Sequence, residues 1–463
     1  MLWFKHFLFV NTSNKYRGLV IAGTHSSVGK SSISSGLMHL LKQKGYSIKP
    51  FKAGPDYIDP GHHSSACGRP SYNLDTVMCS PNYVKALYND IMNAGDTAII
   101  EGVMGLHDGA SSKSEKGSTA ALAKLLNLPV MLVIDGRAMA RSSAALVLGF
   151  MNLDPEVNIA GIIANNINSA RHAKIIKDAV EHHTSAKLLA CLPTVQELTI
   201  PSRHLGLHQS IEQKIDIYEK WSNHIEAHIN FKSFLNLFKI KKQSTNHLKK
   251  EPKRWRTKPK PRTLNIAIAK DEAFQFIYQD TLDYLEHQGF NISFFSPIND
   301  PLLPPKMDIC YFPGGYPELH AKALSKNHSL IKDIKKAALA GKVIIGECGG
   351  LMYLGKYLIN EKGQKSSMVG LFDYETSIKT RKLTLGYRKL KPFKTSDQKL
   401  TLNGHEFHYS TFAKNNENPL WTNTKSKHEI SDGFNNKNCY SFYTHIYWGN
   451  NKNWLNHLME TDK

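Results

Sequence analysis

Residues 17–32, RGLVIAGTHSSVGKSS, decide the fold of the first half of the chain. The run at 17–23 is short and apolar, as in a buried strand, and the apolar pattern that follows, as far as Lys44, predicts a helix. The glycine-containing loop between them ends in Gly-Lys-Ser. A loop in this position is typical of phosphate binding, because backbone N–H groups and the helix N-terminus attract phosphate oxygens. Thr24 stands where strict spacing requires glycine, so a chance glycine loop is the alternative.

Two acidic loops farther along fit the same chemistry. In such a site Lys30 reaches the outer phosphates and the Ser31 hydroxyl ligates Mg²⁺. The loop at 54–60, GPDYIDP, follows a predicted strand and carries two carboxylates, although Asp and Pro also favour ordinary turns. Glu101 ends the apolar run TAIIE, where a second Mg²⁺-binding carboxylate belongs, although it fits a solvated strand end too.

Strands and helices alternate along most of the chain, which predicts parallel sheets covered by helices on both faces. Short apolar runs recur through the first half, and the same alternation restarts with LNIAIA at 264–269. We therefore predict two α/β domains in the following arrangement: an unassigned extension at 1–16, a phosphate-loop domain at 17–235, a basic linker at 236–262 and a second α/β domain at 263–463.

Charge and cysteine usage bound the function classes. The 463 residues are 41% hydrophobic and carry a formal net charge of +20, of which the segment 241–262 supplies +9 from ten Lys or Arg and one Glu. That segment has a single aromatic residue, Trp255, so a solvated tether is a better interpretation than a nucleic-acid-binding arm. No run of about 18 apolar residues predicts a membrane span. Six scattered cysteines without a C-x-x-C pair predict a cytoplasmic, reducing environment.

A second catalytic motif lies at 346–350, GECGG, directly after a predicted strand. The pattern G-x-C-x-G at a strand-to-helix turn is typical of a nucleophile elbow with sulfur in place of oxygen. The turn exposes the Cys348 thiol, and the helix N-terminus lowers its pKa. The N–H of Gly349 and those of the loop 313–317, PGGYP, are placed to form an oxyanion hole. An inert buried cysteine is the alternative.

A thiol nucleophile requires a base, which should come from a distant strand end because the contact is spatial. Two stretches offer histidines, GHEFHY with His405 and His408, and YTHIY with His445. Spacing alone does not choose among the three.

Taken together, these motifs resemble one family, the cobyrinic acid a,c-diamide synthases. The resemblance covers nearly all of 17–463 and depends on long strings in the family's order, among them AGTHSSVGKSS, FKAGPDYIDPGHH, IEGVMGLHDG, FPGGYPELHA, GECGGLMYLG and GHEFHYS. It implies an N-terminal phosphate-loop domain similar to dethiobiotin synthetase and a C-terminal domain similar to class I glutamine amidotransferases. The extension 1–16 and the linker are outside it.

The resemblance assigns roles to matching positions. It implies Cys348 as nucleophile and His445 as its base, with a Cys–His dyad because Tyr447 stands where many relatives carry glutamate. Ser27 replaces a glycine that is common in the family's phosphate loop. The remaining implied residues are the oxyanion-hole pair Gly315 and Gly349; the ATP-binding residues Thr24, Gly29, Lys30, Ser31, Ser32 and Asn165, the last for adenine; the Mg²⁺ ligands Ser31, Asp56 and Glu101; and the substrate-loop residues Tyr57, Ile58 and Asp108.

The implied reaction is the amidation of the a and c carboxylates of cobyrinate, with ATP, Mg²⁺ and glutamine. Ammonia released from glutamine would pass internally, because in water near pH 7 it would mostly become ammonium. We expect no membrane or nucleic-acid partner, and the oligomeric state, a homodimer included, stays open. Three alternatives remain: the same reaction on hydrogenobyrinate or nickel-sirohydrochlorin, a phosphate-loop regulator with an inactive second domain, and a nucleic-acid-binding protein that uses the linker.

Overall fold

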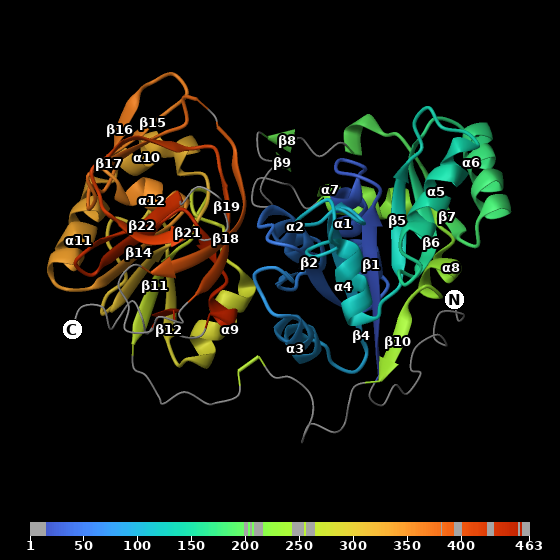
Figure 1. Ribbon diagram of the computed structural model, residues 1–463, viewed down its shortest axis with the longest axis horizontal. Coiled ribbons are helices and arrows are strands. Elements are labelled where there is room, and N and C mark those ends of the chain that lie inside the picture. Colours follow the sequence, from blue (N-terminus) through green and yellow to red (C-terminus); the bar gives the residue numbers. More distant parts are fainter. Residues whose placement is uncertain are drawn as a thin grey trace, which may run out of the picture. The chain divides into compact units, whose positions relative to one another are not determined.

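The computed structural model describes residues 15–198, 202–203, 206–207, 216–242, 254–255, 264–380, 382–392, 401–423, 430–451 and 454–455. Most of the expected extension 1–16 lies outside these residues, and its last two residues open the first strand. The chain divides into two compact units, Met1–Arg254 and Trp255–Lys463, which are described separately (Figure 1).

The first unit is built on an eight-stranded sheet with the order β3-β2-β4-β1-β5-β6-β7, to which β10 adds by pairing with β1. All pairs along that order are parallel, and β10 is antiparallel. The strands are β1 (Lys15–Gly23), β2 (Ser47–Ala53), β3 (Tyr72–Leu74), β4 (Asp96–Gly105), β5 (Val130–Asp135), β6 (Ile159–Ile167), β7 (Lys187–Pro193) and β10 (Lys239–Lys242).

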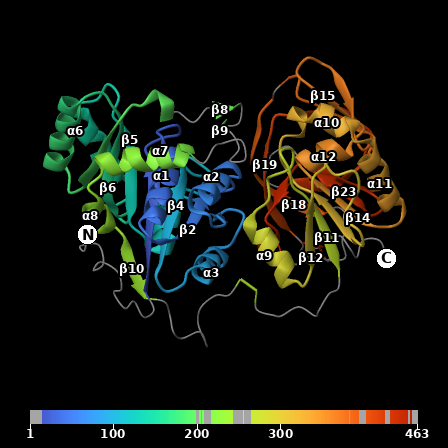
Figure 2. The same ribbon diagram turned by 180° about the vertical axis from the view of Figure 1, so that it is seen from behind.

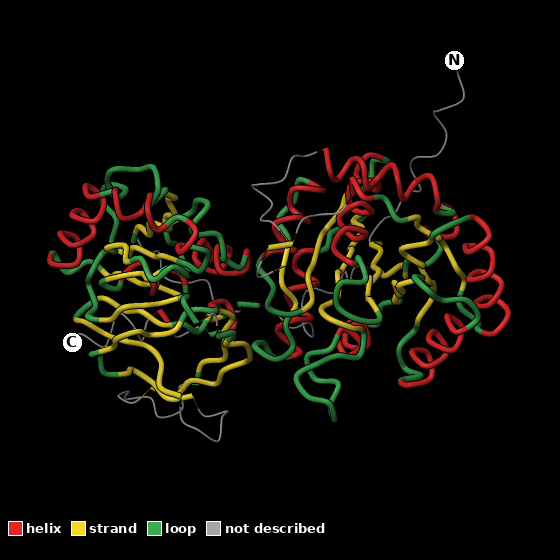
Figure 3. The backbone as a smooth tube through the Cα atoms, turned by 90° about the horizontal axis from the view of Figure 1, so that it is seen from above, coloured by secondary structure: helices red, strands yellow, loops and turns green. Residues whose placement is uncertain are grey.

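Helices connect these strands and lie on both sides of the sheet (Figure 3). They are α1 (Lys30–Gln43), α2 (Ile58–Cys67), α3 (Pro81–Ile91), α4 (Thr119–Leu126), α5 (Ser142–Leu153), α6 (Ala170–His183), α7 (Asp216–His228) and α8 (Phe231–Leu235). A 3-10 turn, η1 (Gln196–Leu198), and a two-stranded ribbon, β8 (Ser202–Arg203) with β9 (Gly206–Leu207), complete the unit. Helix α7 packs against α1 (Figure 2).

The central strand β1 shows why this sequence folds as a covered parallel sheet. Leu19, Val20, Ile21 and Ala22 are all fully buried, so both faces of the strand are apolar and each face needs a helical cover. Leu19 and Ile21 pack into one core with side chains of α1 and α7. The carboxyl ends of β1, β4, β5 and β6 lie at one edge of the sheet, where the loops that follow them meet.

The second unit has a ten-stranded sheet whose first half is parallel and whose second half is antiparallel. The strand order is β12-β11-β13-β14-β23-β22-β21-β18-β19-β24. The strands are β11 (Asn265–Ala269), β12 (Asn291–Phe295), β13 (Ile309–Phe312), β14 (Val343–Glu347), β18 (Thr384–Pro392), β19 (Leu402–His408), β21 (Pro419–Asn423), β22 (Ile430–Asn436), β23 (Cys439–Phe442) and β24 (His445–Ile446). Sequence periodicity predicted the parallel half, whereas the antiparallel half was not anticipated.

A four-stranded sheet and several helices flank this large sheet. The small sheet has the order β16-β15-β17-β20, formed by β15 (Tyr357–Ile359), β16 (Lys365–Ser367), β17 (Tyr374–Ser377) and β20 (Thr411–Asn415). The helices are α9 (Gln279–His287), α10 (Ala321–Lys326), α11 (His328–Leu339) and α12 (Gly349–Leu354), with 3-10 turns η3 (Pro317–Leu319) and η4 (Trp448–Asn450). The α/β class predicted from the sequence is confirmed for both units.

The linker expected at 236–262 differs from a solvated tether wherever the structure describes it. Residues 239–242 form β10, which pairs with the first residues of β1. Arg254 is buried and its Nε donates to Asp90 at 3.1 Å. Trp255 stacks on His287, and its ring N–H donates to the Gly449 carbonyl at 3.1 Å. The high lysine and arginine content of the segment therefore gave no sign that Arg254 and Trp255 pack against the folded units. Residues 243–253 and 256–263 lie outside the described residues.

Within the described residues, no helix combines the length and the apolar character that crossing a membrane would require.

Candidate active sites

The loop that joins β1 to α1 has the backbone shape of a phosphate-binding loop. Leu106 N donates to the Gly23 carbonyl at 2.8 Å and Thr24 N to the Val133 carbonyl at 3.0 Å, so the loop starts between β4 and β5. Gly29 has φ 99° and Ser27 has φ 66°. Only glycine adopts such angles without strain. The angle at Ser27 therefore explains why glycine is common at this position.

Lys30 begins α1 and is buried beside the loop. Its Nζ donates to the His25 carbonyl at 3.3 Å. Burial and the positive charge of Lys52 lower the pKa of Lys30 to about 8, and the negative charge of Glu101 acts in the opposite direction. A bound phosphate group would raise the pKa of Lys30 again, because it places negative charge next to the ammonium group.

Glu101 at the end of the buried part of β4 is the centre of a charge cluster. Ser31 Oγ donates to its Oε1 at 2.8 Å, Lys52 Nζ to the same oxygen at 2.9 Å, and His63 Nε2 lies 2.6 Å from its Oε2. Burial acts to raise the pKa of Glu101, but the Lys52 charge and the His63 hydrogen bond outweigh it and hold this pKa well below the ordinary value. Glu101 therefore stays ionised although it is fully buried.

Lys52 joins Glu101 to a second carboxylate, Asp59 on α2. Lys52 Nζ contacts the Asp59 carboxylate and also donates to the Gly102 carbonyl at 3.0 Å. Burial acts to lower the pKa of Lys52, but Asp59 and Glu101 outweigh it and raise this pKa. Burial raises the pKa of Asp59. Sequence reasoning missed Lys52 and His63, and it noted Asp59 as one of the two carboxylates of GPDYIDP without giving it a role. The signal for all three was their shared position in FKAGPDYIDPGHH, which spans the end of β2 and the first half of α2.

Asp56, predicted as a metal ligand, is engaged in the local backbone. Its Oδ1 accepts from Ile58 N at 2.7 Å and Asp59 N at 3.1 Å, which satisfies the start of α2. The structure thus brings Ser31 and Glu101 into direct contact, whereas Asp56 accepts from the backbone at the start of α2 and acts on Lys52 through its charge. In the described part of the chain, no three or more His, Cys, Asp and Glu side chains are grouped as metal ligands.

The other predicted ATP and substrate residues lie around the same edge of the sheet. Asn165 lies near the end of β6, and its Nδ2 donates to the Val28 carbonyl at 3.0 Å, so it braces the phosphate loop. Asp108 accepts from Gly105 N at 2.8 Å in the loop after β4, and its charge acts on Lys30. The remaining predicted positions follow from the element bounds: Thr24 and Gly29 in the phosphate loop, Ser32 in α1, and Tyr57 and Ile58 at the start of α2.

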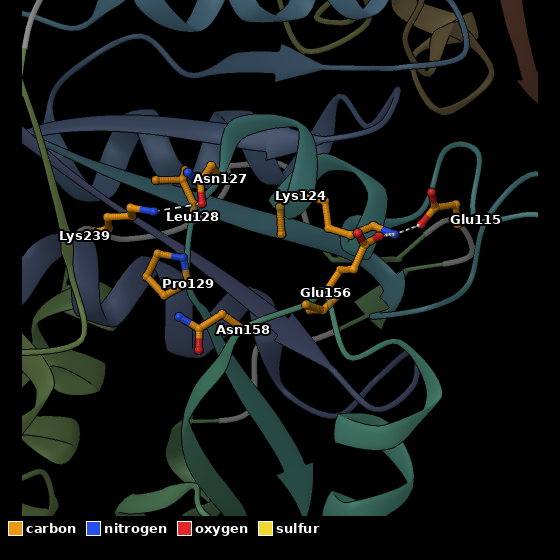
Figure 4. A pocket seen from close by; sticks show the side chains of 10 residues that line it. Glu115, Lys124, Asn127, Leu128, Pro129, Glu156, Asn158 and Lys239 are labelled. Carbon is orange, nitrogen blue, oxygen red and sulfur yellow. Dashed lines mark hydrogen bonds and ion pairs between the residues drawn. The ribbon is translucent and has the colours of Figure 1, made fainter.

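A pocket of about 320 Å³ elsewhere in the first unit is not part of this site (Figure 4). It lies where β5 begins, at the edge opposite the phosphate loop, and includes Asn127, Pro129 and Asn158. Lys124 at its rim pairs with Glu115 at 2.5 Å (Figure 4). It also pairs with Asp154 at 2.6 Å, and the second lining lysine, Lys239, donates to Asn127 Oδ1 at 2.8 Å.

The second site is centred on Cys348, at the turn from β14 to α12. Cys348 has φ 51° and ψ −100°, a strained conformation of the kind concentrated at functional sites. Its N–H donates to the Phe442 carbonyl at 2.8 Å. A Cβ on Gly350 would lie 2.0 Å from the Phe312 carbonyl oxygen, and one on Gly346 would lie 2.8 Å from the Gly350 carbonyl oxygen. The glycines of G-x-C-x-G therefore let strand and helix meet closely enough to form the nucleophile elbow.

The predicted oxyanion-hole glycines lie next to each other. A Cβ on Gly349 would be 2.9 Å from Gly315 N and 2.9 Å from Pro317 Cδ. The loop after β13 therefore packs directly on the residue that follows Cys348. Two backbone N–H groups beside one thiol are the arrangement that stabilises a tetrahedral oxyanion.

His445 of β24 is the histidine that meets Cys348. Burial acts to lower the pKa of His445, but the charge of Cys348, a hydrogen bond between the two side chains, and Glu347 outweigh burial and raise this pKa to about 10. A histidine with these neighbours is suited to holding the thiol proton as part of an ion pair.

His445 has a carboxylate partner that sequence reasoning did not anticipate. Its Nδ1 lies 2.8 Å from Glu347 Oε1, with both side chains buried. Glu347 is the residue just before the nucleophile, whereas Tyr447 packs on Tyr278. The histidine is thus oriented by a third group from β14 instead of from its own segment. The available signal was the acidic residue inside GECGG, at the end of an otherwise apolar strand.

The two competing histidines are not suited to act as the base. Burial lowers the pKa of His405 to about 3 and that of His408 to about 4. His405 pairs across β19 and β24 with His445, and His408 stacks on Tyr443 with Nδ1 2.9 Å from the Ser410 carbonyl oxygen. They line the region around His445 without replacing it.

Comparison with known proteins gives matches over both units. Residues 19–207 match the CobQ/CobB/MinD/ParA nucleotide binding domain, and residues 265–453 match the CobB/CobQ-like glutamine amidotransferase domain. A cobyrinate a,c-diamide synthase of Caldanaerobacter subterraneus subsp. tengcongensis is 38% identical, over 93% of this chain and 95% of its own length. The enzymes of that name from Methanobrevibacter smithii and Salmonella typhimurium are 37% and 34% identical, with coverage of 93% and 96% of this chain and 95% and 98% of theirs.

Proposed function

Since the chain belongs to the cobyrinate a,c-diamide synthase family, we propose that it amidates the a and c carboxylates of cobyrinate. The reaction uses ATP and takes its nitrogen from glutamine, in the biosynthesis of cobalamin. The observation that supports the assignment of residues is the grouping of Cys348, His445 and Glu347 in one unit: His445 Nδ1 lies 2.8 Å from Glu347 Oε1, and Cys348 raises the pKa of His445.

We propose the following roles in the second unit. The Cys348 thiolate attacks the δ-carbon of glutamine, and the N–H groups of Gly315 and Gly349 receive the oxyanion. His445 holds the thiol proton and returns it to the departing ammonia, while Glu347 accepts from Nδ1 and fixes the ring. Water then hydrolyses the thioester and regenerates the thiol.

The first unit supplies the activation step. A carboxylate resists attack by ammonia because its leaving group is poor, and phosphorylation by ATP turns it into an acyl phosphate. We propose that Lys30 and the loop N–H groups bind the phosphates, with Thr24, Gly29, Ser31 and Ser32 in the same loop and helix start. Asn165 is proposed to contact adenine, and Tyr57, Ile58 and Asp108 to contact the corrin.

Mg²⁺ fits this donor set. Mg²⁺ is usually bound by one or two carboxylates together with phosphate oxygens, and the Ser31 hydroxyl and the Glu101 carboxylate lie 2.8 Å apart next to the phosphate loop. We propose that Ser31 and Glu101 hold the ion, with Asp56 as the third ligand predicted from the sequence. When bound, the ion would neutralise charge that develops on the phosphate groups.

The test is glutamine-dependent ATP hydrolysis with cobyrinate and, separately, with its metal-free analogue hydrogenobyrinate. We expect ATP turnover, glutamate and diamide to appear together with cobyrinate. Turnover with hydrogenobyrinate alone would move the substrate to that macrocycle. No macrocycle-dependent turnover, together with a salt-dependent gel shift of DNA, would favour a nucleic-acid-binding protein instead.

A further inference from the structure

A carboxylate beside the thiol of the second unit has no part in the steps described above. Glu318 lies in η3, in the loop that follows β13 and packs on Gly349 through Pro317. Tyr443, which directly follows β23, is near both groups: burial raises its pKa, and the charges of Cys348 and Glu318 add to that rise. The loops after three neighbouring strands, β13, β14 and β23, therefore bring Glu318, Cys348 and Tyr443 to one edge of the sheet.

Glu318 is unusual because one of its oxygens is enclosed and unused. Its Oε2 has no solvent-exposed surface and no hydrogen-bond partner among the described residues. A buried carboxylate oxygen without a partner is costly, and native proteins usually satisfy such groups. Burial raises the pKa of Glu318 to about 7, with the charge of Glu361 adding to it and the backbone N–H of Glu318 opposing it. A cationic ligand group would satisfy this oxygen and keep the carboxylate charged.

We infer that Glu318 binds the α-ammonium group of glutamine and so sets the specificity of the thiol site for an α-amino acid amide. The inference rests on the proposed function, in which Cys348 attacks the δ-carbon of glutamine. The α-ammonium group is attached three carbon–carbon bonds from that δ-carbon, so it extends past the thiol into its surroundings. Among the groups placed there, Glu318 is an acceptor with an unused oxygen, whereas Tyr443 accepts from Ser410 Oγ at 3.0 Å.

This role predicts strong discrimination against amides that lack the α-ammonium group. Glutaramate, which is glutamine without its α-amino group, keeps the scissile amide and the distal carboxylate. Removing one partner of a buried charge pair typically lowers binding by about 30-fold or more. The wild-type enzyme should therefore hydrolyse glutaramate with kcat/KM at least about 30-fold below that for glutamine.

The test combines this analogue with Glu318→Gln in the full-length enzyme. The variant should raise KM for glutamine by about 30-fold or more while changing glutaramate hydrolysis by only a few fold, so that the discrimination collapses. Glu361→Gln is the matched control, because Glu361 is an exposed carboxylate whose charge acts on Glu318. Ammonia-dependent synthesis should be unchanged in both variants. In the wild type, KM for glutamine should rise as the pH falls below about 7, because protonated Glu318 loses its charge.

Three results would overturn the inference: wild-type enzyme that does not distinguish the two amides, Glu318→Gln that keeps the discrimination, or a fall in kcat alone with KM unchanged. If Glu318→Gln does not fold, Glu318→Asp replaces it and should show an intermediate loss of discrimination. Failure of the proposed function is separately visible, because in that case Cys348→Ala would hydrolyse glutamine at the wild-type rate.

Discussion

The two active sites differ in how their buried charges are balanced. In the second unit, the proposed catalytic residues Cys348, His445 and Glu347 are neighbours, with His445 Nδ1 2.8 Å from Glu347 Oε1 and the charge of Cys348 acting on His445. In the first unit, Glu101 contacts Ser31, Lys52 and His63 at the same time. A bound nucleotide would compete with Glu101 for these side chains. The thiol site is therefore preorganised by protein atoms alone, whereas ATP binding has to exchange partners within the Glu101 cluster.

The largest effect should separate the two sites completely. Cys348→Ala removes the nucleophile, and loss of a nucleophile in a catalytic triad has lowered kcat by on the order of 10⁶-fold. Glutamine-dependent amidation should disappear, while amidation with a high concentration of ammonium salt should continue, because the ATP site is in the other unit. Equal loss with both nitrogen sources, in a folded variant, would contradict this division of work.

His445→Ala should be the next largest change, because it leaves the nucleophile without its base. Loss of a general base typically lowers turnover by about 10²–10⁴-fold. Glutaminase activity should fall by that order, and alkylation of Cys348 by iodoacetamide at neutral pH should slow. His405→Ala is the control, since burial lowers the pKa of His405 to about 3 and its imidazole is therefore neutral near pH 7. Slower alkylation in His405→Ala but not in His445→Ala would show that the base is misassigned.

Lys30→Ala tests the other side of the comparison. Removing one group that stabilises developing charge in an active site costs about 10²–10³-fold. Synthesis should fall by that order with glutamine and with ammonia alike, because acyl phosphate formation precedes both. Thioester formation on Cys348, trapped with labelled glutamine, should persist. Wild-type rates of amidation with this variant would rule out the phosphate-loop assignment.

Local motifs predicted Lys30 and Cys348, and the family resemblance added His445, whereas Lys52 and Glu347 were missed for a physical reason. Lys30 and Cys348 lie in local strand–loop–helix motifs, where spacing along the chain fixes the geometry. Lys52 contacts Glu101 from 49 residues away and His445 contacts Glu347 from 98 residues away, so these pairs depend on strand order in the sheet. The same limit applies to the antiparallel half of the second sheet, where strands such as β19 and β22 are mostly polar and lack a clear apolar pattern.

The smallest predicted loss of activity comes from exchanging Glu347. This variant tests whether the thiol site depends on a buried carboxylate, as the Glu101 cluster does. Glu347→Gln keeps the shape of the side chain and removes its charge. Hydrogen bonds to charged groups contribute about 1.5–3 kcal/mol, so glutaminase turnover should fall by roughly 10–100-fold.

The titration of His445 gives a readout that a merely structural role of Glu347 would not move. In the wild type, the pKa of His445 is raised from 6.5 to about 10, so its contribution to stability is complete below pH 6.5 and is lost as the pH rises through 10. In Glu347→Gln the midpoint followed by NMR of the imidazole should fall, yet stay above 6.5 because Cys348 remains. The free energy of unfolding should then stop falling at a lower pH than in the wild type, so that less stability is lost above pH 6.5. Glu375→Gln, an exchange at an ion pair with Lys365 in the small sheet, is the matched control and should leave the midpoint unchanged. An unchanged midpoint in Glu347→Gln as well would mean that Cys348 alone sets the protonation of His445, and that the thiol site is a dyad.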